Sequence, residues 1–455
     1  MFAHYRLRRG LDIPLKGEAD RLTVPVEPSA EYAIKPTDFQ HIIPKLLCKE
    51  NDRVLIGTPL FSDKNRPNLL FTSPVSGRVS AIVRGDKRRL LEIRILPDNT
   101  DTAVTFPTAA PEELPREQIV DLLLQSGLWP YIIQRPYGLI ARPEDTPKAL
   151  FISCFNSAPL APDYDFVFAD RQEQLEMGLR VIERLCPGNI HLGLSHNTSA
   201  HSVFKRLKAH IHIFRGPHPA GNVGVQIHHV CPVGKGQVVW TLSPMGLAAI
   251  GHLFLTGMYD NSRMVALTGS ACLRPQYVLC RQGLQLSALQ EYAAPREEEV
   301  RYVSGDPLTG DNAGPAGFLG FYHQQVTFLP EGNTRELFGW ARPFRFKKFS
   351  AARTYLSYLS TRFGKTFRFD LNTNTNGGVR AFVMTGEYRK VLPMDIFVSF
   401  LLKAILAGDI DKMEALGIYE VIPEDLALCE FVCSSKVEIQ QILQDGIDLM
   451  IKEMQ

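Results

Sequence analysis

The stretch that decides the fold is Gly216-Pro217-His218-Pro219-Ala220-Gly221-Asn222-Val223-Gly224. It follows an alternating strand at residues 210–214 and precedes a second apolar segment, residues 225–233, which we expect to be another strand. Proline fixes φ and glycine permits positive φ, so a turn this rich in both holds its backbone tightly. Eight of the twelve histidines fall between residues 191 and 229, which makes the region a candidate site.

The histidines of this region could bind a metal or have a purely structural role. Side chains alternate along a strand, so His210 and His212 share a face, and His218, His228 or His229 would complete a zinc site. No Cys-x-x-Cys or His-Glu-x-x-His motif accompanies them, and neighbouring residues of a strand point to opposite faces. We therefore favour structural polar residues that line an interface or turn, and expect no metal.

Length and composition indicate an ordinary globular protein of several domains. A chain of 455 residues forms about three domains, because a single core rarely grows past roughly 250 residues. The net charge of +2 gives no argument for nucleic acid, and we expect none as a partner. The eight cysteines are scattered without a Cys-x-x-Cys pair, which argues against zinc ribbons and iron–sulfur clusters and suits a reducing compartment.

Two apolar segments, residues 242–258 and 396–406, invite a membrane interpretation. Both are interrupted by polar residues or proline and are shorter than the ~20 apolar residues of a spanning helix. The N-terminus is basic but has no apolar stretch behind it, so it does not resemble a signal peptide. We expect a soluble chain whose membrane contact, if any, is peripheral.

Residues 1–105 consist of short strands separated by turns. The pattern Asp52-Arg53-Val54, followed by Ser73-Pro74-Val75-Ser76-Gly77, is similar to a biotinyl/lipoyl-type barrel-sandwich domain. A carrier domain of that type needs a lysine at its hairpin tip. Here the tip falls at Arg66-Pro67, and the nearest lysine is Lys64. We interpret the domain as a scaffold that carries no covalently attached prosthetic group.

The rest of the chain divides into three further domains. Residues 106–260 alternate strand and helix patterns, which predicts a parallel sheet covered by helices, a Rossmann-like α/β domain. Residues 261–334 return to strands and form a small β-grasp module of the SLBB type. The glycine-rich stretch 310–320 precedes another strand pattern, so we interpret it as a turn and not a phosphate loop. Residues 335–455 are mostly helical.

A basic and aromatic stretch lies at residues 335–370, with nine Lys/Arg against two acidic residues, a local net charge of 9 − 2 = +7. It is either a solvated loop or a surface for an anionic membrane or a partner protein. RNA is disfavoured because no RNA-binding motif accompanies it. The residues that we assign to this patch are Trp340, Arg342, Arg345, Lys347, Lys348 and Arg353.

Five stretches together resemble one family, the NqrA family, whose members belong to the Na⁺-translocating NADH:quinone oxidoreductase, a bacterial respiratory complex. They are residues 10–14, 73–77, 216–221, 244–257 and 417–429, and they span nearly the whole chain in order. The domain order also resembles the NADH-binding subunit of respiratory complex I and the C subunit of Rnf-type complexes. Those relatives have a Rossmann-like layer, a β-grasp module and a helical domain that holds an iron–sulfur cluster.

The chain departs from those relatives where they bind cofactors. Their glycine-rich flavin and NADH loop is replaced by Ser126-Gly127-Leu128-Trp129-Pro130, and their acidic stretch by Asn156-Ser157-Ala158-Pro159. Their cluster-binding cysteines are reduced to Cys429 and Cys433, too few for a cluster that needs four. The resemblance therefore implies a kept fold without bound flavin, NAD or cluster, although the complex as a whole uses NADH, flavins, iron–sulfur and quinone.

Two functional hypotheses follow from the resemblance. In the first, the chain is a peripheral subunit on the cytoplasmic face of the bacterial inner membrane, docked to the membrane-embedded B subunit and the flavin-carrying C subunit and inactive alone. In the second, it contacts quinone near His218 or residues 242–257 and takes part in quinone reduction. The surface that we assign to quinone or a partner consists of Gly216, Pro217, His218, Pro219, Gly221 and Gly224.

Overall fold

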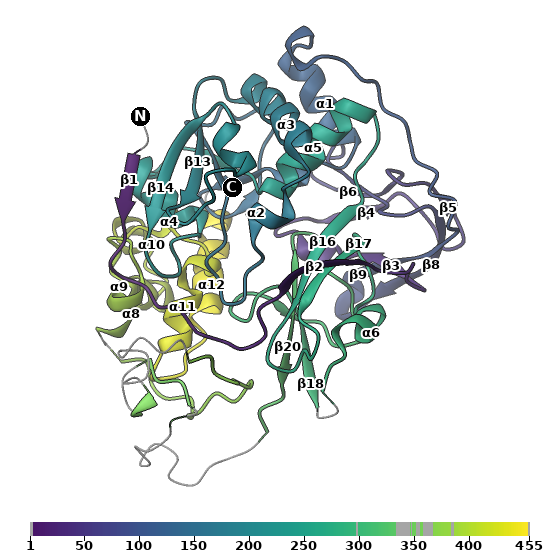
Figure 1. Ribbon diagram of the computed structural model, residues 1–455. Helices are drawn as coiled ribbons and strands as arrows, with labels where there is room; N and C mark the ends of the chain where they lie inside the picture. The colour runs from purple at the N-terminus through teal and green to yellow at the C-terminus, as the bar shows by residue number, and fades with distance from the viewer. Residues whose placement is uncertain are drawn as a thin grey trace.

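The computed structural model describes residues 3–296, 299–333, 346, 348–351, 355–357, 367–383 and 386–453. Figure 1 shows an α/β region beside two further β-rich regions, with the C-terminal helices in yellow packed below the α/β region. A barrel-sandwich domain, a Rossmann-like layer, an SLBB-like sheet and a C-terminal group of helices are all present. The predicted fold class is confirmed.

The Rossmann-like layer is a seven-stranded sheet. Five of its strands run parallel, and the last two are added antiparallel at one edge. In spatial order the strands are β1 (Ala3–Arg6), β14 (His210–Arg215), β13 (Ile190–Ser195), β12 (Leu150–Ser153), β15 (Val239–Thr241), β10 (Ile133–Arg135) and β11 (Leu139–Ile140).

Helices follow the parallel strands, as the alternating pattern predicts. Parallel neighbours cannot be joined by a tight hairpin and need a crossover connection, usually helical. The helices of this layer are α1 (Arg116–Gln125), α2 (Tyr164–Val167), α3 (Gln172–Leu185), α4 (Val223–Val230) and α5 (Pro244–Thr256).

The expectation of a strand at residues 225–233 is wrong, because the segment forms α4. A short apolar run cannot be assigned to strand or helix from periodicity alone. The topology decides the matter here, since β14 runs parallel to its neighbours and the chain must cross over before it re-enters the sheet as β15. His228 and His229 therefore lie on the last turn of a helix.

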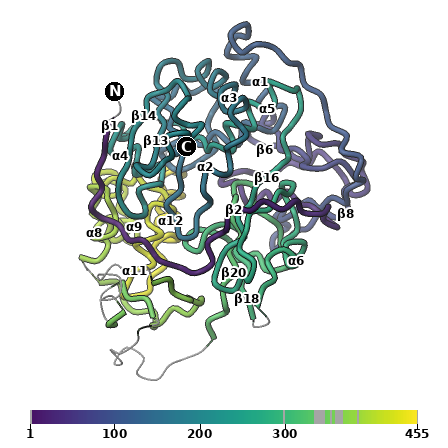
Figure 2. The backbone as a smooth tube through the Cα atoms, in the orientation of Figure 1, coloured from purple at the N-terminus to yellow at the C-terminus, as the bar shows by residue number. Residues whose placement is uncertain are grey.

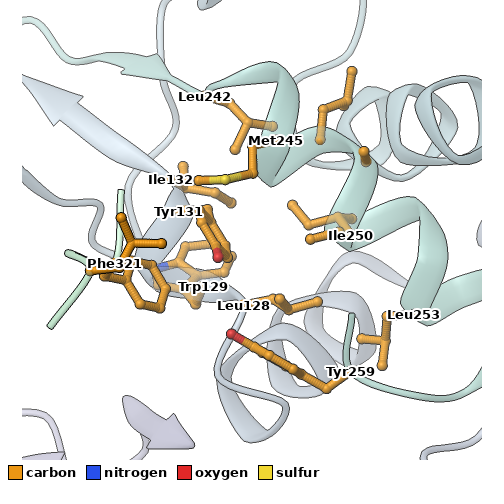
Figure 3. Packing of buried hydrophobic residues seen from close by; sticks show 14 of the residues in the cluster. Leu128, Trp129, Tyr131, Ile132, Leu242, Met245, Ile250, Leu253, Tyr259 and Phe321 are labelled. Atoms are coloured by element: carbon orange, nitrogen blue, oxygen red, sulfur yellow. The ribbon is translucent and has the colours of Figure 1, made fainter. Parts of the chain in front are cut away.

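Helices α3 and α5 pack closely because each has a glycine where they cross. A Cβ atom on Gly251 would lie 1.8 Å from the Gln174 carbonyl oxygen, and one on Gly178 would lie 2.1 Å from that of Leu247. Helix α5 is buried on nearly all sides, which is typical of a core helix that is apolar all round. Its apolar residues 242–258 thus serve the core, as Figure 3 shows for Leu242, Met245, Ile250 and Leu253.

The barrel-sandwich domain contains two sheets. One comprises β3 (Tyr32–Ile34), β9 (Leu90–Pro97), β8 (Gly77–Arg84) and β5 (Arg53–Val54), and the other β4 (Pro44–Leu46), β6 (Pro59–Asp63) and β7 (Leu70–Thr72). Arg66 lies in the hairpin between β6 and β7, where its guanidinium binds the Asp63 carboxylate and the Ile140 carbonyl oxygen. The tip that would carry a prosthetic group in a carrier domain therefore docks on the α/β layer.

The SLBB-like sheet has six strands. In spatial order they are β19 (Asp311–Asn312), β18 (Val300–Ser304), β20 (Gln325–Pro330), β16 (Ser262–Thr268), β17 (Gln276–Arg281) and β2 (Asp20–Pro25), with the short helix α6 (Gln290–Ala293) nearby. The glycine-rich stretch 310–320 leads into β20 and no helix follows it, so the interpretation as a turn is confirmed.

The first 25 residues do not remain within the predicted 1–105 domain. Strand β1 pairs in parallel with β14 in the Rossmann-like sheet, and β2 pairs in parallel with β17 in the SLBB-like sheet. Figure 2 follows this segment, in purple, across the front of the molecule between the two sheets. The two strands satisfy the open backbone edges of sheets that form from residues far along the chain.

The C-terminal helices are α8 (Glu387–Val391), α9 (Val398–Leu406), α10 (Ile410–Ala415), α11 (Pro423–Val432) and α12 (Ile439–Glu453). They enclose a core of their own, which contains Leu401, Leu426 and Ile447 and also reaches Val225 of α4. The helical domain is thus packed onto the α/β layer.

A buried ion pair lies at this junction. Arg135 Nη1 donates to Asp425 Oδ2 at 2.8 Å, and the two side chains are 3% and 0% exposed. Asp425 Oδ2 also accepts from the backbone N–H of Ile422, at the start of α11. Its other oxygen lies against Gly224 of α4, where a Cβ atom would come within 2.5 Å. The carboxylate therefore lies near the positive N-terminal ends of two helices as well as an arginine.

We expect Gly251→Val to lower the free energy of unfolding by about 3 kcal/mol or more, because the new side chain overlaps the backbone of α3. Urea unfolding followed by circular dichroism measures the change. Gly386→Ala is the control, since a Cβ atom there meets nothing within 4 Å. Similar losses in both variants would contradict the close contact between the two helices.

We expect Asp425→Ala to lower the free energy of unfolding by about 3–5 kcal/mol, because it leaves the Arg135 charge buried without a partner. The double variant Arg135→Met/Asp425→Leu removes both charges and should recover most of this loss. Glu112→Ala, which breaks the exposed pair with Arg180, should have little effect in the same assay. A double variant as unstable as the single one would argue that packing, and not the unpaired charge, is responsible.

Candidate functional site

The Gly216–Gly224 turn connects β14 to α4 at the carboxyl edge of the parallel strands. That edge is where open α/β sheets bind ligands. Residues 216 and 217 reach the surface, whereas 218–222 and Gly224 are buried by other parts of this chain. Of the surface that we assigned to quinone or a partner, only Gly216 and part of Pro217 therefore face solvent; His218, Pro219, Gly221 and Gly224 lie inside.

His218 joins three segments of the chain. Its backbone N–H donates to Asp12 Oδ1 at 2.8 Å, and its carbonyl oxygen accepts from the Leu11 N–H at 2.8 Å. Its ring Nδ1 lies 3.1 Å from Ser157 Oγ, which accepts from the Gly221 N–H. Burial lowers the pKa of His218, against the opposing effect of Asp306 and Asp12. The ring is thus held neutral between the turn, the N-terminal segment and the 156–159 loop.

The glycines of the turn permit close contacts between backbones. A Cβ atom on Gly216 would lie 2.8 Å from Leu7 Cβ, and one on Gly221 would lie 2.6 Å from the Ser157 nitrogen. The N-terminal segment is equally close, since a Cβ atom on Gly10 would lie 2.3 Å from the His218 carbonyl oxygen. The turn is rigid because it is packed on all these sides.

The eight clustered histidines do not form one site. His191, His210 and His212 lie on strands β13 and β14, where His191 Nδ1 is 2.9 Å from His212 Nε2. Burial, together with the neighbouring histidines, lowers the pKa of His191 to about 4. No group of three or more His, Cys, Asp or Glu side chains is placed to hold a metal ion in the part of the chain that the structure describes.

The other two histidines singled out, those of α4, contact the C-terminal helical domain. His228 Nδ1 lies 2.6 Å from Glu420 Oε2, and its Nε2 accepts from the Asp395 N–H at 3.1 Å. His229 Nε2 donates to the Pro393 carbonyl oxygen at 2.9 Å. These rings therefore line an interface within the chain, which agrees with the structural role that we favoured from the sequence.

The loop at residues 126–130 is filled by the chain's own side chains. Trp129 is fully buried, its indole N–H donates to the Ala141 carbonyl oxygen at 2.8 Å, and its ring meets Trp240 edge-on. The Tyr322 hydroxyl donates to the Pro130 carbonyl oxygen at 2.8 Å. Figure 3 shows Trp129 surrounded by Leu128, Tyr131, Ile132 and Phe321. These side chains form a hydrophobic core on one side of the loop, and on another side Trp129 lines a pocket of about 400 Å³ together with Leu69, Val120 and Leu124.

The two other positions that replace cofactor-binding motifs also serve packing. Asn156 caps its own loop by accepting from the Ala158 N–H at 2.8 Å. Cys429 and Cys433 are fully buried at the end of α11. The Tyr388 hydroxyl lies 3.1 Å from the Cys433 sulfur, and burial raises the pKa of Cys429. Neither thiol is exposed as a ligand.

A pocket of about 300 Å³ lies beside the residues that surround His218. Asp12, Ser157 and Asp306 surround His218, whereas the pocket is lined by their near neighbours. Its walls are mostly apolar, with a few amide, hydroxyl and guanidinium groups at the side of β18 and the 371–374 loop. The lining residues that define it are Ile13, Pro159, Val303, Leu308, Leu371, Phe431, Arg301, Asn312, Asn372 and Thr373.

Sequence reasoning did not find this pocket. Its residues come from the N-terminal segment, the 156–159 loop, the SLBB-like sheet, the 371–374 loop and α11. No single stretch carries a motif for it, and an apolar residue on a pocket wall looks like any core residue in sequence. The only sequence signal nearby is the His218 turn itself.

The basic-aromatic patch falls almost entirely outside the described residues. Trp340, Arg342, Arg345, Lys347 and Arg353 are not among them. Lys348 is described, and its Nζ donates to Asn376 Oδ1 at 3.2 Å. The patch therefore stays a prediction. No helix among the described residues is both long enough and apolar enough to cross a membrane.

Three family models match the chain. The NqrA N-terminal barrel-sandwich hybrid domain matches residues 5–98, the NqrA second alpha/beta domain residues 114–259, and the NQRA C-terminal domain residues 264–314. A crystal structure of an NAD⁺-reducing NiFe-hydrogenase in the air-oxidized state covers 74% of this chain and 65% of its own at 13% identity, with a TM-score of 0.40. That similarity is too low to support an inference.

Relatives match over nearly their full length. The A subunit of the Na(+)-translocating NADH-quinone reductase of Serratia proteamaculans is 39% identical, and the match covers 98% of this chain and 99% of the relative. The corresponding protein of Rhodopirellula baltica is 35% identical, with 98% of both chains covered. This chain therefore belongs to the NqrA family, the A subunits of the Na(+)-translocating NADH-quinone reductases, and is part of that oxidoreductase complex.

Proposed function

We propose that this chain is a peripheral docking subunit without a flavin, NAD or iron–sulfur cluster of its own. It lies on the cytoplasmic face of the bacterial inner membrane, bound to the membrane-embedded B subunit and the flavin-carrying C subunit, and stabilises them. Electron transfer from NADH to quinone and the coupled sodium export take place in the assembled complex, and the isolated chain is inactive.

The observation that carries this proposal is the filled carboxyl edge of the Rossmann-like sheet. A dinucleotide needs a glycine-rich turn and a free helix N-terminus at that edge. In this chain the N-terminus of α4 is covered by α11, with Asp425 against Gly224. A carboxylate at this position also repels a phosphate. The edge therefore binds the helical domain in place of a nucleotide.

The former cofactor positions support the same proposal. Trp129 occupies the loop where phosphates would need close backbone contact, and its indole is satisfied by the Ala141 carbonyl oxygen. Cys429 and Cys433 lie in the core of the helical domain, with Tyr388 beside them. Two buried thiols cannot supply the four ligands of a cluster. What remains is a rigid body of four domains, which suits a scaffold.

We expect the purified chain to show only the aromatic protein band in its ultraviolet–visible spectrum, because the 126–130 loop lacks the glycines of a flavin loop and Cys429 and Cys433 are too few for a cluster. Acid extraction followed by fluorescence and iron analysis quantifies both. The chain should also show no NADH oxidation alone. In cells lacking it, the yield of the other assembled subunits should fall. Stoichiometric flavin, or NADH oxidation by the isolated chain, would contradict the proposal.

A second candidate function is contact with quinone, and the pocket beside His218 favours it. Its volume of about 300 Å³ lies at the lower end of small-molecule sites, and apolar walls with a few polar groups are typical of such sites. The pocket is formed by several domains together, which is a common location for ligands. The other location that we considered, residues 242–257, consists mainly of helix α5, most of whose side chains are buried in the core.

We expect a short-chain ubiquinone to bind the purified chain saturably if this candidate is correct, as measured by isothermal titration calorimetry. Asn312→Trp would place an indole ring at the rim of the pocket and weaken binding by on the order of tenfold. The matched control is Asn197→Trp, because Asn197 is also exposed but lies after β13, away from the pocket. Absence of saturable heat, or equal weakening by both substitutions, would exclude the pocket as a quinone site.

A further inference from the structure

A second cleft lies between the barrel-sandwich domain and the C-terminal helix α12. Its volume is about 650 Å³, and it is open to solvent along one side. One wall is the segment 36–46, the other is the turn between β8 and β9, and α12 closes one end through Gln444 and Asp448. The cleft shares none of its lining residues with the pocket beside His218.

The wall formed by the β8–β9 turn is strongly basic. Arg84, Arg88 and Arg89 line the cleft, and Lys87 lies between them in the chain. All four side chains are exposed. No carboxylate forms an ion pair with any of the four in the part of the chain that the structure describes. Four cations thus share this short turn with one carboxylate, that of Asp86, which leaves the turn a net charge of +3.

The acidic side chain that lines the cleft is already engaged. Asp448 Oδ1 lies 3.0 Å from His41 Nε2 and accepts from Gln444 Nε2 at 2.6 Å. Its carboxylate thus contacts His41 and Gln444, and it forms no ion pair with the arginines among the described residues. The cleft as a whole presents a positive potential, and the low-dielectric walls of a cleft focus such a potential on a bound partner.

The turn that carries the arginines is held in a fixed shape. The Gly85 N–H donates to the Arg89 carbonyl oxygen at 2.8 Å, and Arg84 Nη1 donates to the Arg88 carbonyl oxygen at 3.1 Å. Lys87 and Arg88 have φ angles of 51° and 61°, a left-handed conformation that costs energy for residues other than glycine. The cations are therefore preorganised, which reduces the entropy lost on binding.

The opposite wall is partly apolar. Phe39, Ile42 and Leu46 line it beside Thr37, Gln40 and His41, and alternate residues of β4 face the cleft. Beside them, Ile43 is 51% exposed and Leu47 is 49% exposed. Exposed apolar residues gathered beside a cleft mark a contact with another protein more often than isolated ones do. The site thus combines apolar contact on one side with positive charge on the other.

We infer that this cleft binds a short acidic segment of another protein of the complex, with carboxylates on the arginines and apolar side chains on the β4 wall. The inference rests on the proposed docking function and specifies the chemistry of the segment that docks here. A peptide fits better than a membrane because the arginines line a recess, whereas a bilayer contacts a flat or protruding surface. A small anion would leave the apolar wall without a partner.

A test uses a fluorescent synthetic peptide of about ten residues that alternates glutamate and leucine, with fluorescence anisotropy as the readout. We expect saturable binding to the full chain that weakens between about 50 mM and about 300 mM sodium chloride. The variant Arg84→Glu/Arg88→Glu/Arg89→Glu should bind on the order of tenfold or more weakly. The matched control is Lys16→Glu/Lys208→Glu/Arg274→Glu, which makes the same change in charge at exposed positions outside the cleft and should bind normally.

The same variants are then expressed in the whole complex with a tag on this chain. We expect the arginine variant to retain less of the other subunits than the control variant does, at equal circular dichroism and melting temperature. Equal peptide binding by all three chains, equal losses in both variants, or binding of anionic phosphatidylglycerol vesicles in place of the peptide would overturn the inference. The docking function itself would still stand if the control and wild-type chains hold the complex together.

Discussion

The buried pair between Arg135 and Asp425 is the interaction on which the rest of the structure depends. A buried carboxylate is tolerated only when opposite charge and hydrogen bonds surround it. Here they come from an arginine at the end of β10, the Ile422 N–H at the start of α11, and the N-terminal end of α4 across Gly224. The three groups must assemble together, so the α/β layer and the helical domain are fixed to one another at this point.

This constraint also decides what the Rossmann-like layer can do. The edge of a parallel sheet where helices begin is the place for phosphates, because the helix N-termini are positive there. In this chain the Asp425 carboxylate, and not a phosphate, lies at the positive N-terminus of α4. The glycines of the Gly216–Gly224 turn pack against Leu7, Ser157 and Asp425. The features that suggest a ligand site in sequence serve the contact between domains. The open clefts lie elsewhere, where several domains meet.

The N-terminal segment adds a second constraint. Strand β1 completes one sheet and β2 another, while Asp12 and Leu11 bind the backbone of His218 between them. Gly10 is required on this path because a side chain there would collide with the His218 carbonyl oxygen. A single extended segment thus ties the two sheets to the turn. A segment held at so many points suits the docking role that we propose.

The sequence by itself determined the fold class, the family and the loss of cofactor motifs, because these depend on local patterns. Alternation predicts strands, apolar spacing predicts α3, and Trp129 with the missing glycines argues against a phosphate loop at residues 126–130. Only the tertiary structure decided that residues 223–230 form a helix, that the first 25 residues leave their domain, and that the eight histidines separate. It alone revealed both clefts and the Arg135–Asp425 pair, whose residues lie 290 positions apart. Contacts of that kind depend on which surfaces meet in the folded protein, and no periodic pattern in the sequence indicates which surfaces these are.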